Sequence, residues 1–415
     1  MNKNYYITTP IYYPSAKPHM GHAYTSIIAD FFARFKRIDG YNVHFLTGTD
    51  EHGLKIQRAA EKNNTDPFIF CNQISQTFRD LSKILNLSNT DFIRTTEERH
   101  KKTVQHIWSE LKKNDNIYLS KYSGWYSVSD EAFYNEDEIN EKDGVKIAIS
   151  SGSVVEWIEE ESYFFRLSKW QDKLLAYYEK NPDFISPISR KNEVISFVKS
   201  GLKDLSISRK AFSWGIKVPN NSDHVIYVWL DALTNYISAL NYPKLNDALF
   251  IKFWPASVHI IGKDILRFHA VYWPAFLMAA NVPLPEKIFG HGWILSGDEK
   301  MSKSKGNILD PLDIIEIYGL DPLRYYLIKE VSFGNDGNIS QDKLEDCINS
   351  DLANNYGNLC QRVTAFAEKN CSLKIPSNKK LIDEDFAILN KFTKNLSKLR
   401  SEIDKQNINF YIDFI

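Results

Sequence analysis

The first sixty residues alternate between strand-like and helix-like patterns, and this order restricts the possible folds more than any other feature. Residues 5–9 are aromatic or β-branched, and residues 21–37 form an amphipathic pattern with a helical period. A second strand pattern covers residues 42–47, and another helical pattern begins near Gly53. A strand–helix–strand–helix opening is typical of a doubly wound parallel sheet, whose ligands bind at the carboxyl ends of the strands. We therefore predict an α/β fold with its site at that edge.

The alternating pattern is interrupted in the middle of the chain by short polar strands and acidic turns. Apolar strand patterns return at residues 225–229, 258–261 and 287–290, and from residue 340 the pattern is almost wholly helical. The last residues, 410–415, stop within an apolar helical stripe without a cap, so we expect a truncated helical domain. The predicted parts are the first half of a Rossmann-type domain (1–116), an insertion (117–222), the second half (223–290), a loop-rich region (291–339) and a partial helical domain (340–415).

Composition limits the classes of function. A chain of 415 residues exceeds the size of one hydrophobic core, which predicts several domains. The formal net charge of -1 excludes a general basic field, so any contact with nucleic acid must be local. The four cysteines are scattered and form no C-x-x-C pair, and the longest apolar run, 270–282, is too short to span a bilayer. We expect a cytoplasmic protein without a membrane segment or an obligate protein partner.

The motif His19-Met20-Gly21-His22 lies where the first loop becomes a helix. A helix N-terminus favours anions through its free N–H groups and its dipole. Gly21 would let a phosphate or an adenine approach the backbone, and the two histidines, three residues apart, share one helix face. The motif predicts a site for ATP; an ordinary pair of surface or core histidines is the alternative.

A polar loop, Lys300-Met301-Ser302-Lys303-Ser304, follows about 280 residues later. Lysine is a compact point charge that suits a departing pyrophosphate. A solvated basic loop is the alternative for this segment taken alone.

Together the two motifs resemble the HIGH and KMSKS signatures of class I aminoacyl-tRNA synthetases, with Met20 in place of the isoleucine. Further segments resemble the methionyl enzymes of that class and extend the resemblance over essentially the whole chain: residues 8–14, 48–53, 228–232 and 262–264. The resemblance implies a Rossmann-type catalytic domain split by a connective-peptide insertion and followed by a helical anticodon-binding domain. It implies an enzyme that joins L-methionine to the 3' end of methionine tRNA, initiator and elongator, with ATP and Mg²⁺.

By position, the resemblance implies that the Ile11 backbone and the Asp50 carboxylate hold the amino group of methionine. Tyr13, Trp229, Ala232, Leu233, Tyr236, Ile265, His269 and Trp273 would line, close or support the pocket of its thioether. An aromatic pocket with one anionic anchor suits a flexible, polarizable and apolar side chain. For each aromatic residue alone, ordinary core packing is the alternative.

The resemblance also implies an ATP site. Gly262 and Asp264 would hold the ribose, and His291 and Gly292 the adenine side, whereas Asp264 could instead cap a helix. Catalysis would rest on His19, His22, Lys300 and Lys303, with Met301, Ser302 and Ser304 in the same loop. No nucleophilic side chain is needed, because the methionine carboxylate attacks the α-phosphorus directly.

The insertion departs from the family pattern. Many relatives carry C-x-x-C zinc knuckles there, but the matching stretches, 126–130 and 150–154, contain no cysteine. We therefore expect no zinc and no metal held by protein side chains.

Asn354, Asn358 and Arg362 are spaced four residues apart on a predicted helix and match the family positions that contact the anticodon. A polar, solvated helix face is the alternative.

Other interpretations of the whole chain are a synthetase for isoleucine, leucine, valine or cysteine, a catalytically inactive tRNA-binding paralogue, and a small-molecule nucleotidyltransferase. The insertion is small for the first three and lacks the thiolates of the fourth, and the presence of both signatures disfavours a paralogue.

Overall fold

The computed structural model describes residues 3–130, 132–142, 144–296, 299–300, 309–372, 374 and 380–414, with only the backbone of Tyr122, Phe133, Glu299 and Lys300. The chain divides into two compact units, Met1–Pro18 with Ala29–Gly290, and His19–Ile28 with His291–Ile415. Each unit is described by itself.

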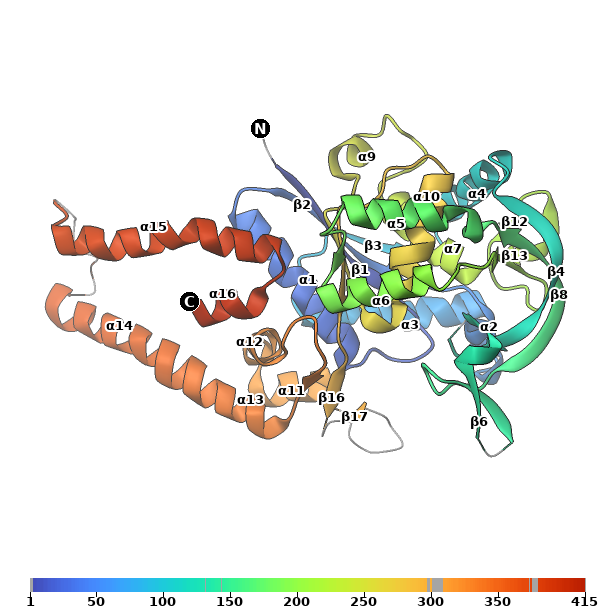
Figure 1. Cartoon of the computed structure of the whole chain (residues 1–415). Coiled ribbons are helices and arrows are strands. Elements are labelled where there is room, and N and C mark those ends of the chain that lie inside the picture. Colours follow the sequence, from blue (N-terminus) through green and yellow to red (C-terminus); the bar gives the residue numbers. More distant parts are fainter. Residues whose placement is uncertain are drawn as a thin grey trace. The chain divides into compact units, whose positions relative to one another are not determined.

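A parallel sheet forms the centre of the first unit (Figure 1). Its strands follow the order β3-β2-β1-β14-β15-β9, and β1 pairs in parallel with β2 and β14, β2 with β3, and β15 with β9. The bounds are β1 Asn4–Tyr12, β2 Asn42–Thr49, β3 Asp91–Arg94, β9 Ile185–Ser186, β14 Val258–Gly262 and β15 Ile288–His291. The predicted doubly wound α/β fold is confirmed.

The connecting helices form where the sequence offers apolar stripes and caps. In α3, Pro67–Ile84, the Asp66 side chain accepts hydrogen bonds from two backbone N–H groups of the first turn, and proline occupies the first position. In α4, Glu98–Lys113, the buried residues recur at helical spacing. Further helices lie between or near these strands in the sequence: α1 Met20–Ile38, α2 Leu54–Lys62, α7 Val228–Leu233, α8 Asn235–Ser238, α9 Ala248–Phe253 and α10 Trp273–Ala279.

The insertion is built on a long antiparallel pair, β4 Ile117–Ser127 with β8 Glu156–Phe165, which curves away from the sheet in Figure 1. β5 Ala132–Tyr134 and β10 Leu205–Ser206 extend this sheet, and β6 Ile139–Lys142 and β7 Val145–Ala148 form a separate hairpin. Helices α5 Gln171–Lys180 and α6 Ile188–Lys199 follow. Between them lies β9, so a strand within 117–222 adds the outer edge of the parallel sheet.

One predicted strand is wrong. Residues 225–229 were expected to continue the parallel sheet, but β13 Asn221–Ile226 pairs antiparallel with β11 Ser208–Arg209 and β12 Lys217–Val218, and α7 begins at Val228. The run 225–229, Val-Ile-Tyr-Val-Trp, is short and apolar. In such a run, periodicity cannot separate a buried helix from a buried strand.

The second unit is mainly helical, as predicted for the C-terminal region. It contains α11 Pro311–Tyr318, α12 Leu320–Glu330, α13 Gln341–Cys347, a π-helix over Ile348–Gly357, α14 Asn358–Cys371, α15 Asp383–Asp404, α16 Ile408–Phe414 and the short strands β16 Ile294–Ser296, β17 Glu299–Lys300 and β18 Gly337–Asn338. Its buried apolar residues include Leu327, Ile403 and Ile408.

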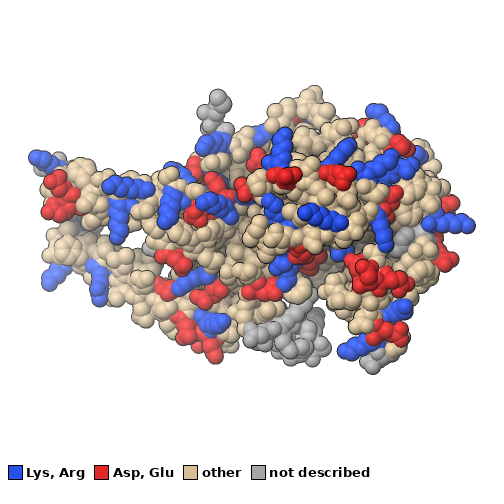
Figure 2. Space-filling model, viewed as in Figure 1, with Lys and Arg blue, Asp and Glu red and all other residues tan. Residues whose placement is uncertain are grey.

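Acidic and basic side chains are interspersed over the visible face in Figure 2, in agreement with a net charge of -1. Among the described residues, no helix is both long and apolar enough to cross a membrane.

Candidate active site

The loop after β2 begins at the carboxyl edge of the parallel sheet. The pairing of β1 with β2 shifts between Thr8 and Ile11, after which Ile11 lies opposite Gly48. A Cβ atom on Gly48 would lie 2.0 Å from the Ile93 carbonyl oxygen, so only glycine fits here. The buried Asp50 follows, and its backbone N–H donates to the Tyr12 carbonyl at 2.9 Å. The sheet therefore brings two predicted methionine contacts, Ile11 and Asp50, to adjacent strand ends.

Glu51 fixes this loop from one side. Arg94 donates to both of its carboxylate oxygens, Nε to Oε1 at 2.6 Å and Nη2 to Oε2 at 2.9 Å, and Thr49 and Thr96 donate as well. The Trp214 indole donates to the Glu51 carbonyl at 2.6 Å. Two parallel hydrogen bonds between Arg94 and the buried Glu51 carboxylate fix the orientation of that side chain, and this restrains the backbone of the neighbouring Asp50. Sequence reasoning missed this network, although two adjacent acids at a strand end are a signal.

A cluster of aromatic rings forms around His269, inside the first unit. The Tyr236 hydroxyl lies 2.7 Å from His269 Nε2, and His269 Nδ1 lies 2.9 Å from the Ile265 carbonyl. Trp229 meets His269 edge-on with ring centroids 6.2 Å apart, and Trp273 lies 6.1 Å from Tyr236. Trp229 also stacks on Phe268 at 3.7 Å. The structure thus gathers four predicted pocket residues, Trp229, Tyr236, His269 and Trp273, into ring contact.

His269 is neutral in this cluster. A carbonyl oxygen only accepts, so Nδ1 carries the proton, and Nε2 accepts from the Tyr236 hydroxyl. Burial lowers the pKa of His269 to about 4, and burial raises the pKa of Tyr236. The cluster contributes no charge from these two groups at neutral pH. It therefore suits an apolar ligand.

The remaining predicted methionine contacts lie on neighbouring elements. Ala232 and Leu233 are buried on α7, and Ile265 is half-buried before the π-helix Phe268–Tyr272 that carries His269. The Tyr13 hydroxyl donates to the His52 carbonyl at 2.8 Å, which joins Tyr13 to the Asp50 loop. π-helical turns are rare and often lie at functional sites.

Gly262 and Asp264 lie at the end of β14 and in the short 3-10 helix Lys263–Ile265. Gly262 is the N-cap of that helix, and Asp264 lies in its first turn rather than at the N-cap position. Asp264 is exposed at the carboxyl edge of the sheet.

The histidine motif lies at the first residues of α1, in the second unit. The rings of His19 and His22 stack with centroids 3.8 Å apart, and the Gly21 N–H donates to His19 Nδ1 at 3.1 Å. A Cβ on Gly21 would lie 3.0 Å from the His19 ring. Burial and the neighbouring His19 lower the pKa of His22 well below its ordinary value, so His22 is neutral at pH 7.

His291 contacts the same helix end. Its Nε2 lies 2.9 Å from the Thr25 hydroxyl, and its Nδ1 lies 2.8 Å from the Gly292 carbonyl. A Cβ on Gly292 would lie 2.1 Å from the backbone of Asn335, so this position requires glycine. The predicted adenine-side residues and the histidine motif are thus neighbours within the second unit.

The predicted lysine loop falls largely outside the described residues. Lys300 lies in β17, where its backbone pairs with Leu295, and nothing is described of its side chain. Met301, Ser302, Lys303 and Ser304 lie outside the described residues.

The predicted anticodon residues lie on two different helical forms. Asn354 is exposed in the π-helix Ile348–Gly357, whereas Asn358 and Arg362 lie on α14. Arg362 is exposed and Asn358 is half-buried. A π-helix has a wider turn than an α-helix, so the predicted single stripe of three side chains does not follow from spacing alone.

Comparison with known proteins defines the class. The model of the family described as class I tRNA synthetases (M) matches residues 5–364. The chain therefore belongs to the class I tRNA synthetases, in the family designated M.

Individual relatives specify the branch. A methionine–tRNA ligase of Rickettsia bellii is 59% identical over 377 residues, which cover 91% of this chain and 73% of the relative. A methionine–tRNA ligase of Rhizobium meliloti is 54% identical over 405 residues, covering 97% and 78%. The solved Mycobacterium tuberculosis methionyl-tRNA synthetase in complex with methionyl-adenylate superimposes with a TM-score of 0.96 at 49% identity, covering 99% of this chain and 81% of that one.

Proposed function

We propose that this chain is a methionine–tRNA ligase, which activates L-methionine with ATP to methionyl-adenylate and transfers it to the 3' end of tRNA in translation. The observation that carries the proposal is the neutral aromatic cluster around His269, in the same unit as the buried Asp50. The family membership and the similarity to a structure with methionyl-adenylate agree with it. We place the reaction in the cytoplasm.

Methionine recognition divides between two kinds of contact. The Asp50 carboxylate and the Ile11 carbonyl accept hydrogen bonds from the ammonium group, while the thioether lies among Tyr13, Trp229, Ala232, Leu233, Tyr236, Ile265, His269 and Trp273. A charge-assisted bond from a buried carboxylate contributes about 1.5–3 kcal/mol. Sulfur and aromatic rings attract each other, which favours methionine over a branched aliphatic side chain.

Activation needs position and charge rather than a nucleophilic side chain. His19 and His22, at the N-terminus of α1, donate to the phosphates, with Gly21 allowing close approach. Asp264 and Gly262 hold the ribose, and His291 and Gly292 the adenine. Lys300 and Lys303, with Met301, Ser302 and Ser304, hold the departing pyrophosphate. Mg²⁺ would be held mainly by the ATP phosphates rather than by protein side chains, and it would supply partial neutralisation of their charge.

The second step uses tRNA. Asn354, Asn358 and Arg362 hydrogen-bond the anticodon bases of both initiator and elongator methionine tRNA, through amide and guanidinium groups that match base edges. The exposure of Asn354 and Arg362 supports this role.

The insertion holds together without zinc. Where the zinc-binding relatives have knuckles, the Asp130 carboxylate accepts hydrogen bonds from Ser151 Oγ at 2.6 Å, Ser153 Oγ at 2.8 Å and the Tyr134 hydroxyl at 2.7 Å, and the Asp130 N–H donates to Ser127 Oγ. These oxygen groups bind one another across the two stretches. Zinc prefers thiolate and imidazole ligands, so this set does not fit a structural zinc site.

The test is ATP–pyrophosphate exchange measured with each of the twenty amino acids. Methionine alone should support rapid exchange, and addition of methionine tRNA should yield methionyl-tRNA. Exchange driven best by isoleucine, valine, leucine or cysteine would refute the proposal, and so would tRNA binding without any exchange.

A further inference from the structure

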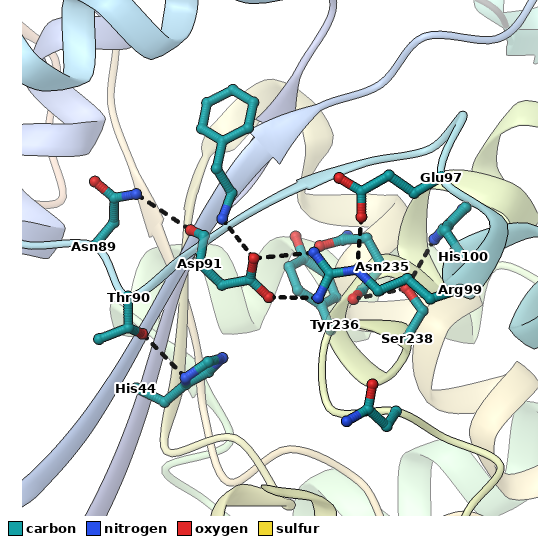
Figure 3. Close-up of polar contacts among 12 residues, drawn as sticks. His44, Asn89, Thr90, Asp91, Glu97, Arg99, His100, Asn235, Tyr236 and Ser238 are labelled. Carbon is teal, nitrogen blue, oxygen red and sulfur yellow. Dashed lines mark hydrogen bonds and ion pairs between the residues drawn. The ribbon is translucent and has the colours of Figure 1, made fainter.

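A second buried carboxylate lies close to the Asp50 loop. Asp231, on α7, is fully buried, and its Oδ2 lies 2.7 Å from His52 Nδ1 while its Oδ1 lies 2.6 Å from His100 Nε2. His100 Nδ1 in turn lies 2.8 Å from Ser238 Oγ, a contact drawn in Figure 3. Both imidazoles are buried as well. One hydrogen-bonded chain therefore runs from His52 through Asp231 and His100 to Ser238.

The protonation of this chain follows from its geometry. Burial raises the pKa of Asp231, but the charges and hydrogen bonds of His52 and His100 outweigh it and lower the pKa overall. Asp231 is therefore ionised, and an ionised carboxylate only accepts. His52 Nδ1 and His100 Nε2 must both carry hydrogens, so each ring is held in one orientation.

The hydrogen bonds from His52 to Ser238 connect parts of the predicted methionine pocket that lie far apart in sequence. His52 stands two residues after Asp50, and its carbonyl accepts from the Tyr13 hydroxyl. Asp231 stands on α7 between Trp229 and Ala232. The segments before and after the insertion thus meet at one buried carboxylate.

Stability alone does not explain such a network. A buried carboxylate with its polar partners loses hydration on folding, and well-packed apolar residues of similar volume often stabilise a fold as well or better. A fully satisfied polar network instead specifies a single arrangement of the segments that it joins.

We propose that Asp231, His52 and His100 are positioning residues for methionine: they hold the Asp50 loop and α7 at the separation that the amino acid requires. This inference rests on the proposed function. The residues act through Asp50 and Tyr13 on one side and through the α7 residues on the other, so they should affect methionine and not ATP.

The test compares three variants in ATP–pyrophosphate exchange. Asp231→Asn turns an amide N–H toward an imidazole N–H, and His52→Ala removes one donor. A group displaced by about 1 Å can lose on the order of a hundredfold in activity, so we expect the KM for methionine to rise about ten- to a hundredfold. The KM for ATP should stay within about twofold. His52→Asn places an amide N–H near the former Nδ1 and should recover most of the loss.

Asp30→Asn is the matched control. Asp30 is equally buried in the first unit, but it accepts from Ser88 and Arg34, neither of which is a predicted methionine contact. It should lower the melting temperature without raising the KM for methionine selectively. If Asp231→Asn does not fold, His52→Ala and His100→Gln supply the same comparison.

An active parent with variants whose KM for methionine is unchanged, or whose two KM values rise equally, would overturn the positioning role alone. A parent without methionine-dependent exchange would refute the proposed function and the positioning role together.

Discussion

Acidification should destabilise the chain through His269, because the folded state holds this ring neutral. The pKa of His269 is about 4 in the folded protein against an ordinary value of 6.5. Between these two values the unfolded state binds more protons than the folded state, so stability falls as the pH falls from 6.5 toward 4. Above pH 6.5 the full contribution is present.

The size of the effect follows from the difference between the two pKa values. About 2.5 units, at about 1.4 kcal/mol per unit, gives roughly 3 kcal/mol when the pH reaches 4 or below. At pH 5 the unfolded ring is almost fully protonated and the folded ring only slightly, so about 2 kcal/mol should already be lost. This is a substantial part of the stability of an average domain.

The assay is urea unfolding followed by tryptophan fluorescence at pH 7 and at pH 5, with the parent and His269→Gln. Glutamine cannot titrate, so the parent should lose about 2 kcal/mol more than the variant on acidification. Other titrating groups, including the buried His44, contribute equally to both proteins and cancel. Equal losses would show that His269 is not held neutral by its contacts, and the tautomer assignment would fail.

Four further results are expected. Lys303→Ala should reduce the turnover of exchange far more than methionine affinity, because that lysine is proposed to act on charge that develops in the transition state; wild-type turnover would show that the loop has no part in the reaction. Asp50→Asn should weaken methionine by about 1.5–3 kcal/mol and ATP little, and equal losses would make Asp50 structural. Asp130→Ala should lower the melting temperature, while metal analysis of the parent finds no stoichiometric zinc; one zinc per chain would contradict the assignment. Arg362→Ala should weaken tRNA charging but not ATP–pyrophosphate exchange. Unchanged charging would refute the anticodon role and show that Arg362 belongs to an ordinary solvated helix face.

The parallel sheet was predictable because its first strands and helices are long and periodic. Residues 5–9 and 42–47 fall within β1 and β2, and their hydrophobic patterns need no tertiary information. The two residues of β9 carry no such pattern, and their place depends on pairing with β15, about a hundred residues later. Short elements take their conformation from their neighbours rather than from their own sequence.

Apart from the residues that the family resemblance implied, the candidate site could be anticipated only where it forms a local motif. The histidine motif and the lysine loop are contiguous segments, whereas His100 and Asp231 are 131 residues apart and meet only in the fold. Nothing in the local sequence distinguishes His100, whose neighbour Arg99 forms an ion pair with Asp91 (Figure 3). Buried polar networks of this kind are set by tertiary contacts, so the sequence alone gives no spacing by which to recognise them.

The proposed selectivity of the aromatic cluster for methionine would follow from its hydrogen bonds. Both His269 nitrogens and the Tyr236 hydroxyl have protein partners, whereas the buried indole N–H groups of Trp229 and Trp273 have none among the described residues. A ligand held in the cluster, as proposed, would meet these two indole N–H groups as hydrogen-bond donors. A thioether is a weak acceptor that loses little on leaving water, and it fits such surroundings. Glutamine has a similar length, but its amide would lose its hydration without finding an acceptor for its N–H groups. If methionine binds in this cluster as proposed, the same pairing that keeps His269 neutral would disfavour a polar side chain of methionine's size.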